Sequence, residues 1–318
     1  MSRYFELTIG TKTWSSHDSN GLQKKGFLKF ELNVVLMGKG ENSNKGVIKL
    51  WGLGLKEIFT GSDYFNQPIS VKVGMNNGLP FANPKSKGVA FTGMVFGRAF
   101  PVHTGLDQYL ELMIITGVPM AMPDYIALEW NQGEKLSTVL ERALKGLPVT
   151  ISIRDDLALF DDDNPNRPRH ARFKGVEDFS QFLEFVSKQS VKETGYLGVK
   201  VFPTNKGLLI TDGSQPQTAK KLEIYDFIGQ PTFQQFGVYD AELICRGDLQ
   251  AGDAVTFPDR MLLRLNQNAV QAERDSDVLS LKGDFIITQI AYNLNSRGNS
   301  ARDWGMVITV NKAGYVQS

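Results

Sequence analysis

Phe27-Leu-Lys-Phe-Glu-Leu-Asn-Val-Val-Leu-Met37 and Val47-Ile-Lys-Leu-Trp51 are the stretches that decide the fold of this chain. Their apolar side chains, such as Leu32 and Ile48, mostly alternate with polar ones, which is the period of a half-buried antiparallel strand. Residues 38–46 between them (GKGENSNKG) are rich in glycine and asparagine, which tolerate positive φ angles and favour a turn. The chain is therefore predicted to open as β-structure, and nothing in this stretch indicates a nucleotide-binding βαβ unit.

The same alternation recurs along the first third of the chain. The strands it predicts are Tyr4–Ile9, Phe27–Met37, Val47–Trp51, Ile69–Val73, Val89–Arg98 and Leu110–Ile115. A short helix is expected within Leu53–Tyr64, and Gly74–Gly78 favours a hairpin turn because Asn-Gly matches the twist of flanking strands. Several short strands at this spacing predict a barrel or a sandwich.

The middle of the chain changes to a helical period. Glu134–Lys145 places Leu136, Val139, Leu140, Ala143 and Leu144 on one face, and Gly146 with Pro148 ends the helix. A strand at Leu147–Ile153 follows, then a helix at Val176–Val186 and a hairpin made by Leu197–Phe202 and Gly207–Thr211. These elements predict a small α/β domain, for which internal duplication is a hypothesis.

The last third of the chain returns to strands. They are expected at Glu223–Ile228, Phe233–Cys245, Ala254–Phe257, Asp284–Asn293 and Arg302–Asn311, with a mobile loop at Asn266–Asp277. A second β-domain is therefore predicted to close the protein.

The bulk composition excludes several classes of partner. The 318 residues, enough for two or three domains, carry 35 basic and 34 acidic side chains, for a formal charge of +1. No basic field attracts nucleic acid. The single cysteine, Cys245, rules out an internal disulfide and suggests a reducing compartment, and three scattered histidines offer little toward a zinc site.

Neither end nor centre of the chain predicts membrane insertion. Glu6 and Lys12 interrupt any signal peptide in the opening residues, so export by that route is not expected. The most apolar stretch, Leu112–Leu128, contains two prolines and an aspartate and is shorter than the roughly 20 apolar residues that span a bilayer. We interpret it as a buried strand followed by a connection between domains.

The one dense carboxylate cluster favours a solvated loop over a metal site. It comprises Asp155, Asp156, Asp161, Asp162 and Asp163. A calcium loop needs alternating ligands and a glycine at its bend, whereas residues 161–169 (DDDNPNRPR) run their acids consecutively into proline and arginine.

Catalytic patterns are also weak. His103 and Asp107 could join a serine in a hydrolytic triad, but the chain has no Gly-x-Ser-x-Gly elbow. Trp51–Leu55 (WGLGL) is only a fragment of a phosphate-binding loop, and Glu134 and Glu141 are spaced like ordinary helix-surface charges. We therefore predict no catalytic residue, no cofactor and no metal.

Aromatic residues are numerous for two small β-domains. Most must belong to the core, but the excess around residues 229–231 (GQP) could mark a subunit contact, because aromatic side chains are enriched in interface cores. The predicted interface residues are Phe227, Phe233, Phe236 and Tyr239.

Three groups of motifs resemble a known family. The first is the opening run Leu28–Val35, Val47–Leu53, Ile69–Met75 and Val89–Gly97; the second is Asn131–Leu136 with Val149–Ile151; the third is Leu249–Phe257, Gly283–Asn293 and Trp304–Val310. In this order they resemble baseplate hub proteins of contractile-tailed bacteriophages, the late-control protein D type. Ala251 replaces a common proline, and Asn293 stands where a histidine is common.

The resemblance implies an α+β, β-dominated multidomain fold with two β-barrel domains and a small α/β domain between them. The expected domains are 1–121, 122–215 and 216–318, and part of 216–245 is a candidate to complete the first barrel. Two similar barrels from each of three chains would give six lobes, which would adapt a six-fold tail tube to a three-fold spike.

The function implied is that of a non-enzymatic structural hub in the virion, located at the tail baseplate and assembled in the host cytoplasm. The implied partners are two further copies in a homotrimer, the tail tube or distal tail protein, the tail spike and the tape measure protein. A tail-associated glycan hydrolase or carbohydrate-binding protein is one alternative. A hexameric distal-tail or tube ring component is another.

Overall fold

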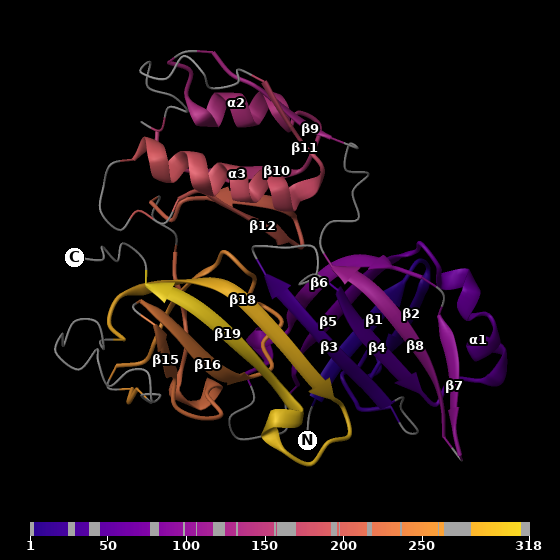
Figure 1. Ribbon diagram of the computed structural model, residues 1–318. Coiled ribbons are helices and arrows are strands. Elements are labelled where there is room, and N and C mark those ends of the chain that lie inside the picture. Colours follow the sequence, from indigo (N-terminus) through magenta and orange to yellow (C-terminus); the bar gives the residue numbers. More distant parts are fainter. Residues whose placement is uncertain are drawn as a thin grey trace.

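The computed structural model describes residues 3–24, 29–37, 45–76, 83–97, 99–105, 107–116, 125–131, 133–155, 157, 170–191, 196, 198–214, 218–235, 237–259, 261–263 and 281–312. The chain is β-dominated, with a large antiparallel sheet system from both ends of the sequence and an α/β part set above it (Figure 1). We call residues 3–116 and 218–312 the β-body, and residues 125–214 the α/β unit. No helix of these residues is long and apolar enough to cross a bilayer.

The first part of the β-body confirms the six predicted strands. Its elements are β1 (Arg3–Ile9), β2 (Lys12–Ser15), β3 (Lys29–Met37), β4 (Lys45–Trp51), α1 (Leu55–Phe59), η2 (Gly61–Tyr64), β5 (Pro68–Met75), η3 (Pro84–Ser86), β6 (Gly88–Val95), β7 (Phe100–Thr104) and β8 (Asp107–Thr116). The sequence did not predict β2 and β7. Both strands are short. β2 follows a tight turn at Gly10 and β7 precedes one at Gly105, and the φ angles of these residues, 55° and 61°, favour glycine.

The last part of the β-body corrects two predictions. Its elements are β14 (Lys220–Lys221), η4 (Ile224–Asp226), β15 (Thr232–Gln235), β16 (Val238–Ile244), β17 (Ala254–Thr256), β18 (Asp284–Asn295), η6 (Ala301–Asp303) and β19 (Trp304–Lys312). The strand predicted at Glu223–Ile228 is wrong, because the Asp226 carboxylate accepts a bond from the Glu223 N–H at 2.9 Å and closes a 3₁₀ turn. The single strand predicted at Phe233–Cys245 is two strands that turn at Gly237.

One sheet joins the two ends of the chain. Its strand order is β15-β16-β19-β18-β3-β4-β8-β6-β5-β1-β2, and the step from the last to the first part of the β-body is the antiparallel pairing of β18 with β3. A single buried cluster underlies both parts, from Phe5 and Leu32 to Tyr292 and Ile308. No pairing among the described strands closes this sheet into a barrel, and the boundaries at 121/122 and 215/216 stay predictions.

The α/β unit has a core of its own. Its elements are β9 (Ile126–Glu129), α2 (Leu136–Ala143), β10 (Val149–Ser152), β11 (His170–Phe173), α3 (Gly175–Ser190), β12 (Lys200–Thr204) and β13 (Gly207–Thr211). Both predicted helices, one strand and the hairpin are confirmed, whereas β9 and β11 were missed. The strands form a β10-β13-β12 sheet and a separate β11-β9 pair around a buried cluster that includes Leu140, Phe179 and Ile210. The predicted loop at Asn266–Asp277 lies outside the described residues.

Candidate functional site

Two neighbouring rows of outward-facing side chains cross the shared sheet from β6 to β16. We call them the sheet face. It comprises Met94, Phe96, Met113, Ile115, Lys45, Val47, Asn33, Val35, Ala291, Asn293, Val307 and Glu242. Gly305 and Ile244, which continue the first row, are not exposed parts of it, because Gly305 is buried against Ile228 and Ile244 packs against the core. Phe96 is 51% exposed, Met113 42% and Val307 38%, although these are large apolar side chains.

The strand register aligns these positions although they come from distant segments. In the first row the Phe96 N–H donates to the Met113 carbonyl at 2.8 Å, and cross-strand partners then follow in the order Met113, Val47, Asn33, Asn293, Gly305 and Ile244. In the second row Met94 pairs with Ile115 and Ile115 with Lys45, and beyond β4 the partners are Val35, Ala291, Val307 and Glu242. Directly opposed residues point to the same side of a sheet, so each row is one ridge of neighbouring side chains.

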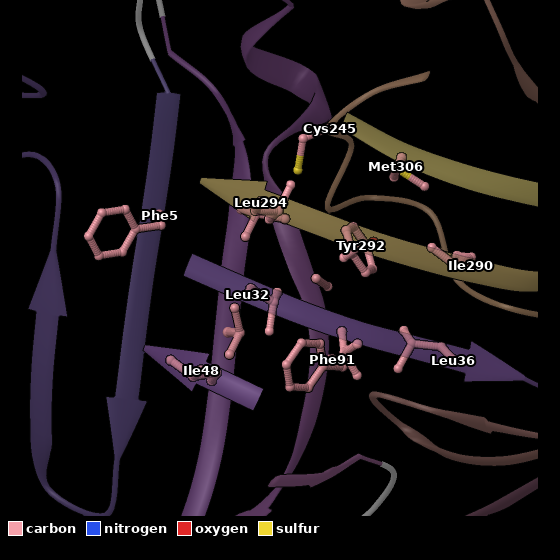
Figure 2. Packing of buried hydrophobic residues seen from close by; sticks show 14 of the residues in the cluster. Phe5, Leu32, Leu36, Ile48, Phe91, Cys245, Ile290, Tyr292, Leu294 and Met306 are labelled. Atoms are coloured by element: carbon pink, nitrogen blue, oxygen red, sulfur yellow. The ribbon is translucent and has the colours of Figure 1, made fainter. Parts of the chain in front are cut away.

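The reverse of the sheet is the buried core. Leu32, Ile48 and Leu294 alternate with sheet-face positions and are at most 1% exposed. Figure 2 shows Leu32, Leu36, Ile48, Tyr292 and Leu294 gathered beneath these strands. Because these inward positions are fixed by packing, the outward ones cannot turn inward without a register shift.

The size of the sheet face is that of a functional patch. The strands that it crosses are spaced about 4.8 Å apart and so span roughly 30 Å, and two rows cover roughly 14 Å along the strands. The resulting outline of about 400 Å², polar positions included, is of the same order as the largest apolar patches on monomers, which are often interaction sites.

Charge is nearly absent from the sheet face and is concentrated beside it. Lys45 and Glu242 are its only formal charges, and Glu242 is paired with Arg302 at 3.0 Å. The adjoining row on β8, β4 and β3 is charged: Lys49 lies 3.6 Å from Glu111. A mostly apolar band, with Asn33 and Asn293 at its middle and charges at its border, resembles the core and rim of a protein interface.

Direct contacts between the first and last parts of the β-body hold this surface in one piece. The Trp304 indole N–H donates to the Gly74 carbonyl at 2.9 Å, and the Arg3 guanidinium donates to the carbonyls of Asn295 and Ser300 at 2.6 and 2.7 Å. A Cβ atom on Gly88 would lie 2.5 Å from the Gly247 carbonyl oxygen, so the two backbones touch there. The two parts are therefore in rigid contact beneath the sheet face.

A buried ion pair lies in the last part of the β-body. The Arg246 guanidinium is 2.7 Å from Asp226 and 2.8 Å from Asp248. Burial works to lower the pKa of Arg246, but Asp248 and Asp226 outweigh it and raise that pKa above its ordinary value. Burial also raises the pKa of Tyr292, whose hydroxyl donates to the Arg246 carbonyl at 3.2 Å. These groups are satisfied within the chain and fix loop geometry.

The predicted interface aromatics that the structure describes lie in or against the buried core and are not part of the sheet face. Phe233 and Tyr239 are 3% and 0% exposed and pack edge to face, with ring centroids 6.0 Å apart. Phe227 is half-buried and contacts Phe257, and Phe236 lies outside the described residues. Core packing accounts for the aromatic excess at these described positions, and a subunit contact through them stays a prediction.

The residues weighed for chemistry are not brought together. His103 and Asp107 lie on the β7–β8 hairpin, where His103 is exposed, and Glu134 on the other unit is bonded to Arg142 at 2.9 Å. Arg142 lowers the pKa of Glu134 to about 2, which suits a structural ion pair. Of the predicted carboxylate cluster the structure describes Asp155 alone, and the described part of the chain holds no group of three or more potential metal ligands.

Sequence reasoning missed the sheet face. One signal was present: in Glu111–Ile115 (ELMII), Met113 and Ile115 occupy outward positions where alternation leads one to expect polar residues. Neither residue could be connected with Val307 or Ala291, because the pairing of β3 with β18 was not predictable.

Comparison with known proteins gives a fold and no family. No protein-family model matches the chain, and no curated protein is similar to it. Among solved structures, the tail protein from Neisseria meningitidis MC58 is similar at 9% identity, with a TM-score of 0.50, over 99% of this chain and 98% of that one. The lidded Francisella PdpA-VgrG complex gives a TM-score of 0.42 at 9% identity over 99% of this chain and 53% of that chain, and the lidless complex gives 0.40 at 12% over 99% and 66%. This chain therefore shares its fold, over nearly its whole length, with the Neisseria tail protein.

Proposed function

We propose that this protein is a structural component of a phage tail or a tail-like assembly. The observation that carries the proposal is the fold shared with the Neisseria tail protein over 99% of the chain. The sheet face adds support, because an exposed, mostly apolar surface with few charges suits protein contact. Its area of about 400 Å² is half of the roughly 800 Å² that each partner contributes to a standard interface, so it would be one contact among several.

Within that assembly the chain acts as a baseplate hub. Three copies form a homotrimer, and the two β-parts of each copy form barrel-like lobes, so that six lobes meet the tail tube and three chains meet the spike. The hub has no enzymatic activity of its own. Its partners are the tail tube or distal tail protein, the spike and the tape measure protein, and its place is the virion baseplate after assembly in the host cytoplasm.

Native mass spectrometry of the purified chain tests the hub. A trimer is expected, alone or on addition of the spike protein. A hexamer would replace the hub with a distal-tail or tube ring component, and a monomer at every concentration and with every tail partner would contradict both.

A turnover assay tests the non-enzymatic role. The chain is incubated with peptidoglycan and with capsular polysaccharide, and reducing ends are measured over time. No release above that of heat-denatured protein is expected, and catalytic turnover would replace the hub with a glycan hydrolase.

A further inference from the structure

The α/β unit is seated on the junction of the two parts of the β-body. The turn between β12 and β13 reaches down to β6, where the Asn205 amide donates to the Val89 carbonyl at 3.3 Å. The same turn meets residues 249–252 of the last part of the β-body. Three segments from three regions of the sequence therefore converge at one place.

Gln250 is the residue that connects all three segments. Its side-chain Nε2 lies within hydrogen-bond distance of three carbonyl oxygens: those of Val89, at 2.9 Å, and Ala90, at 3.1 Å, on β6, and that of Leu249, at 3.0 Å, in its own loop. Its side-chain oxygen accepts from the backbone N–H of Asn205 at 3.4 Å. One glutamine thus uses its donor end on the first part of the β-body and its acceptor end on the α/β unit.

The loop that carries Gln250 is itself held in place. The Gln250 backbone N–H donates to the Asp253 carboxylate at 2.6 Å, and Lys220 pairs with the same carboxylate at 2.7 Å. The backbone contact between Gly88 and Gly247 sets the distance from this loop to β6. The reach of the Gln250 side chain to the Val89 carbonyl therefore depends on the spacing of the two parts of the β-body.

The apolar part of the seat is tightly packed. Gly252 has a φ of +92°, and a Cβ atom there would lie 2.6 Å from Leu209 and 3.2 Å from Phe202. Phe202 is 1% exposed although it belongs to neither of the two main buried clusters. These apolar contacts are not directional, whereas the hydrogen bonds of Gln250 are, so Gln250 is the residue placed to fix the orientation of the α/β unit.

We propose that Gln250 is a latch that holds the α/β unit in one orientation on the β-body. With the latch closed, the unit is bound to both β-parts at once. With the latch open, the unit stays folded around its own core but moves relative to the β-body.

Spin labels on the full-length chain test the latch. Lys145→Cys on the α/β unit and Lys56→Cys on the β-body provide exposed label sites, and the native Cys245 is 0% exposed and does not compete for the label. Double electron–electron resonance of the parent protein should give a single narrow distance. Gln250→Ala should raise the population of displaced units about tenfold, equivalent to about 1.4 kcal/mol.

Two further variants make the test decisive. Asn205→Ala removes only the amide bond to Val89 and should broaden the distance distribution less than Gln250→Ala. Gln108→Ala removes the same atoms from a half-buried glutamine on the β7–β8 hairpin, which lies far from the seat (Figure 1), and should leave the distribution unchanged. The latch is overturned if Gln250→Ala keeps the narrow distance, or if Gln108→Ala broadens it equally.

If Gln250→Ala fails to fold, the same distance measurement can be made on Gln250→Glu. A carboxylate of nearly the same size faces the carbonyls of Val89 and Ala90 and repels them, so displacement should again appear. A narrow distance in Gln250→Glu would overturn the latch.

Discussion

The β-body and the α/β unit are held together in opposite ways. The β-body joins the two ends of the chain: the Phe30 N–H donates to the Ser296 hydroxyl at 2.9 Å across 266 positions of sequence, and one buried cluster serves both parts. The α/β unit packs around a cluster drawn only from its own residues and meets the β-body at the seat formed around Gln250. The middle of this chain therefore has a core of its own, while its distant ends share one core, and we expect the two ends to unfold together.

The largest expected effect comes from Trp304→Ala. Trp304 is 2% exposed, its ring lies 6.4 Å from that of Phe30, and its N–H is bonded to Gly74, so truncation should destabilise the β-body by about 3–5 kcal/mol. Hydrogen exchange should show lost protection in both parts of the β-body and retained protection in α2 and α3.

Phe179→Ala is the matched control for this comparison. Phe179 is 0% exposed in the α/β core, and its truncation should lower protection in that unit alone. If Trp304→Ala affected only β15–β19, the two β-parts would not be one cooperative body.

The next largest effect is expected from the buried ion pairs of Arg246, which hold the loops of the β-body in place. Arg246→Met should cost about 3 kcal/mol in urea denaturation, because it leaves two carboxylates without their buried cation. Arg302→Met breaks the exposed pair with Glu242 and should cost at most about 1 kcal/mol. Equal losses of unfolding free energy in the two variants would mean that burial does not make the Arg246 ion pairs contribute more than an exposed pair.

A charge on the sheet face distinguishes folding from assembly. Val307→Glu places a carboxylate on the sheet face between Ala291 and Glu242, its cross-strand partners, and an unpaired charge beside a like charge is costly to bury. The fold should persist by circular dichroism, while assembly measured by native mass should weaken roughly 30-fold, or about 2 kcal/mol. Ser62→Glu, at an exposed position outside the sheet face, should leave assembly unchanged; equal weakening there would remove the sheet face from the interface.

The smallest effect is a pH dependence at the edge of the β-body. His17 is buried beside Ser16, with its Nδ1 2.7 Å from the hydroxyl, and burial with nearby Lys87 lowers the pKa of His17 against the opposing influence of Asp18. The unfolded chain therefore binds the proton more readily. Stability is full above the ordinary pKa of 6.5 and is lost as the pH falls from there through the lowered pKa of the folded state.

Urea denaturation between pH 7.5 and 5 measures this dependence. His17→Gln should flatten the part of the profile that His17 contributes. An unchanged slope in the variant would assign the dependence to other groups.

Local patterns in the sequence predicted the elements that depend on local physics. Alternation located β3, β4 and β18 because one face of each strand is buried, and the apolar stripe located α2 and α3 for the same reason. The prediction failed at Glu223–Ile228, where the hydrogen bond from the Glu223 N–H to the Asp226 carboxylate stabilises a turn and overrides strand propensity. It also failed to separate β15 from β16, since the turn at Gly237 interrupts a stretch that alternates apolar and polar residues on both sides of it.

The sequence by itself determined that the chain is β-dominated with an α/β segment in its middle. The reason is that the spacing at which apolar residues recur shows which side chains face a core. The tertiary structure alone decided which strands are neighbours. Pairing of β3 with β18 depends on backbone hydrogen bonds, which every residue but proline can make, so no side-chain pattern announced it. That pairing creates the sheet face, because it aligns outward residues from both ends of the chain on one surface.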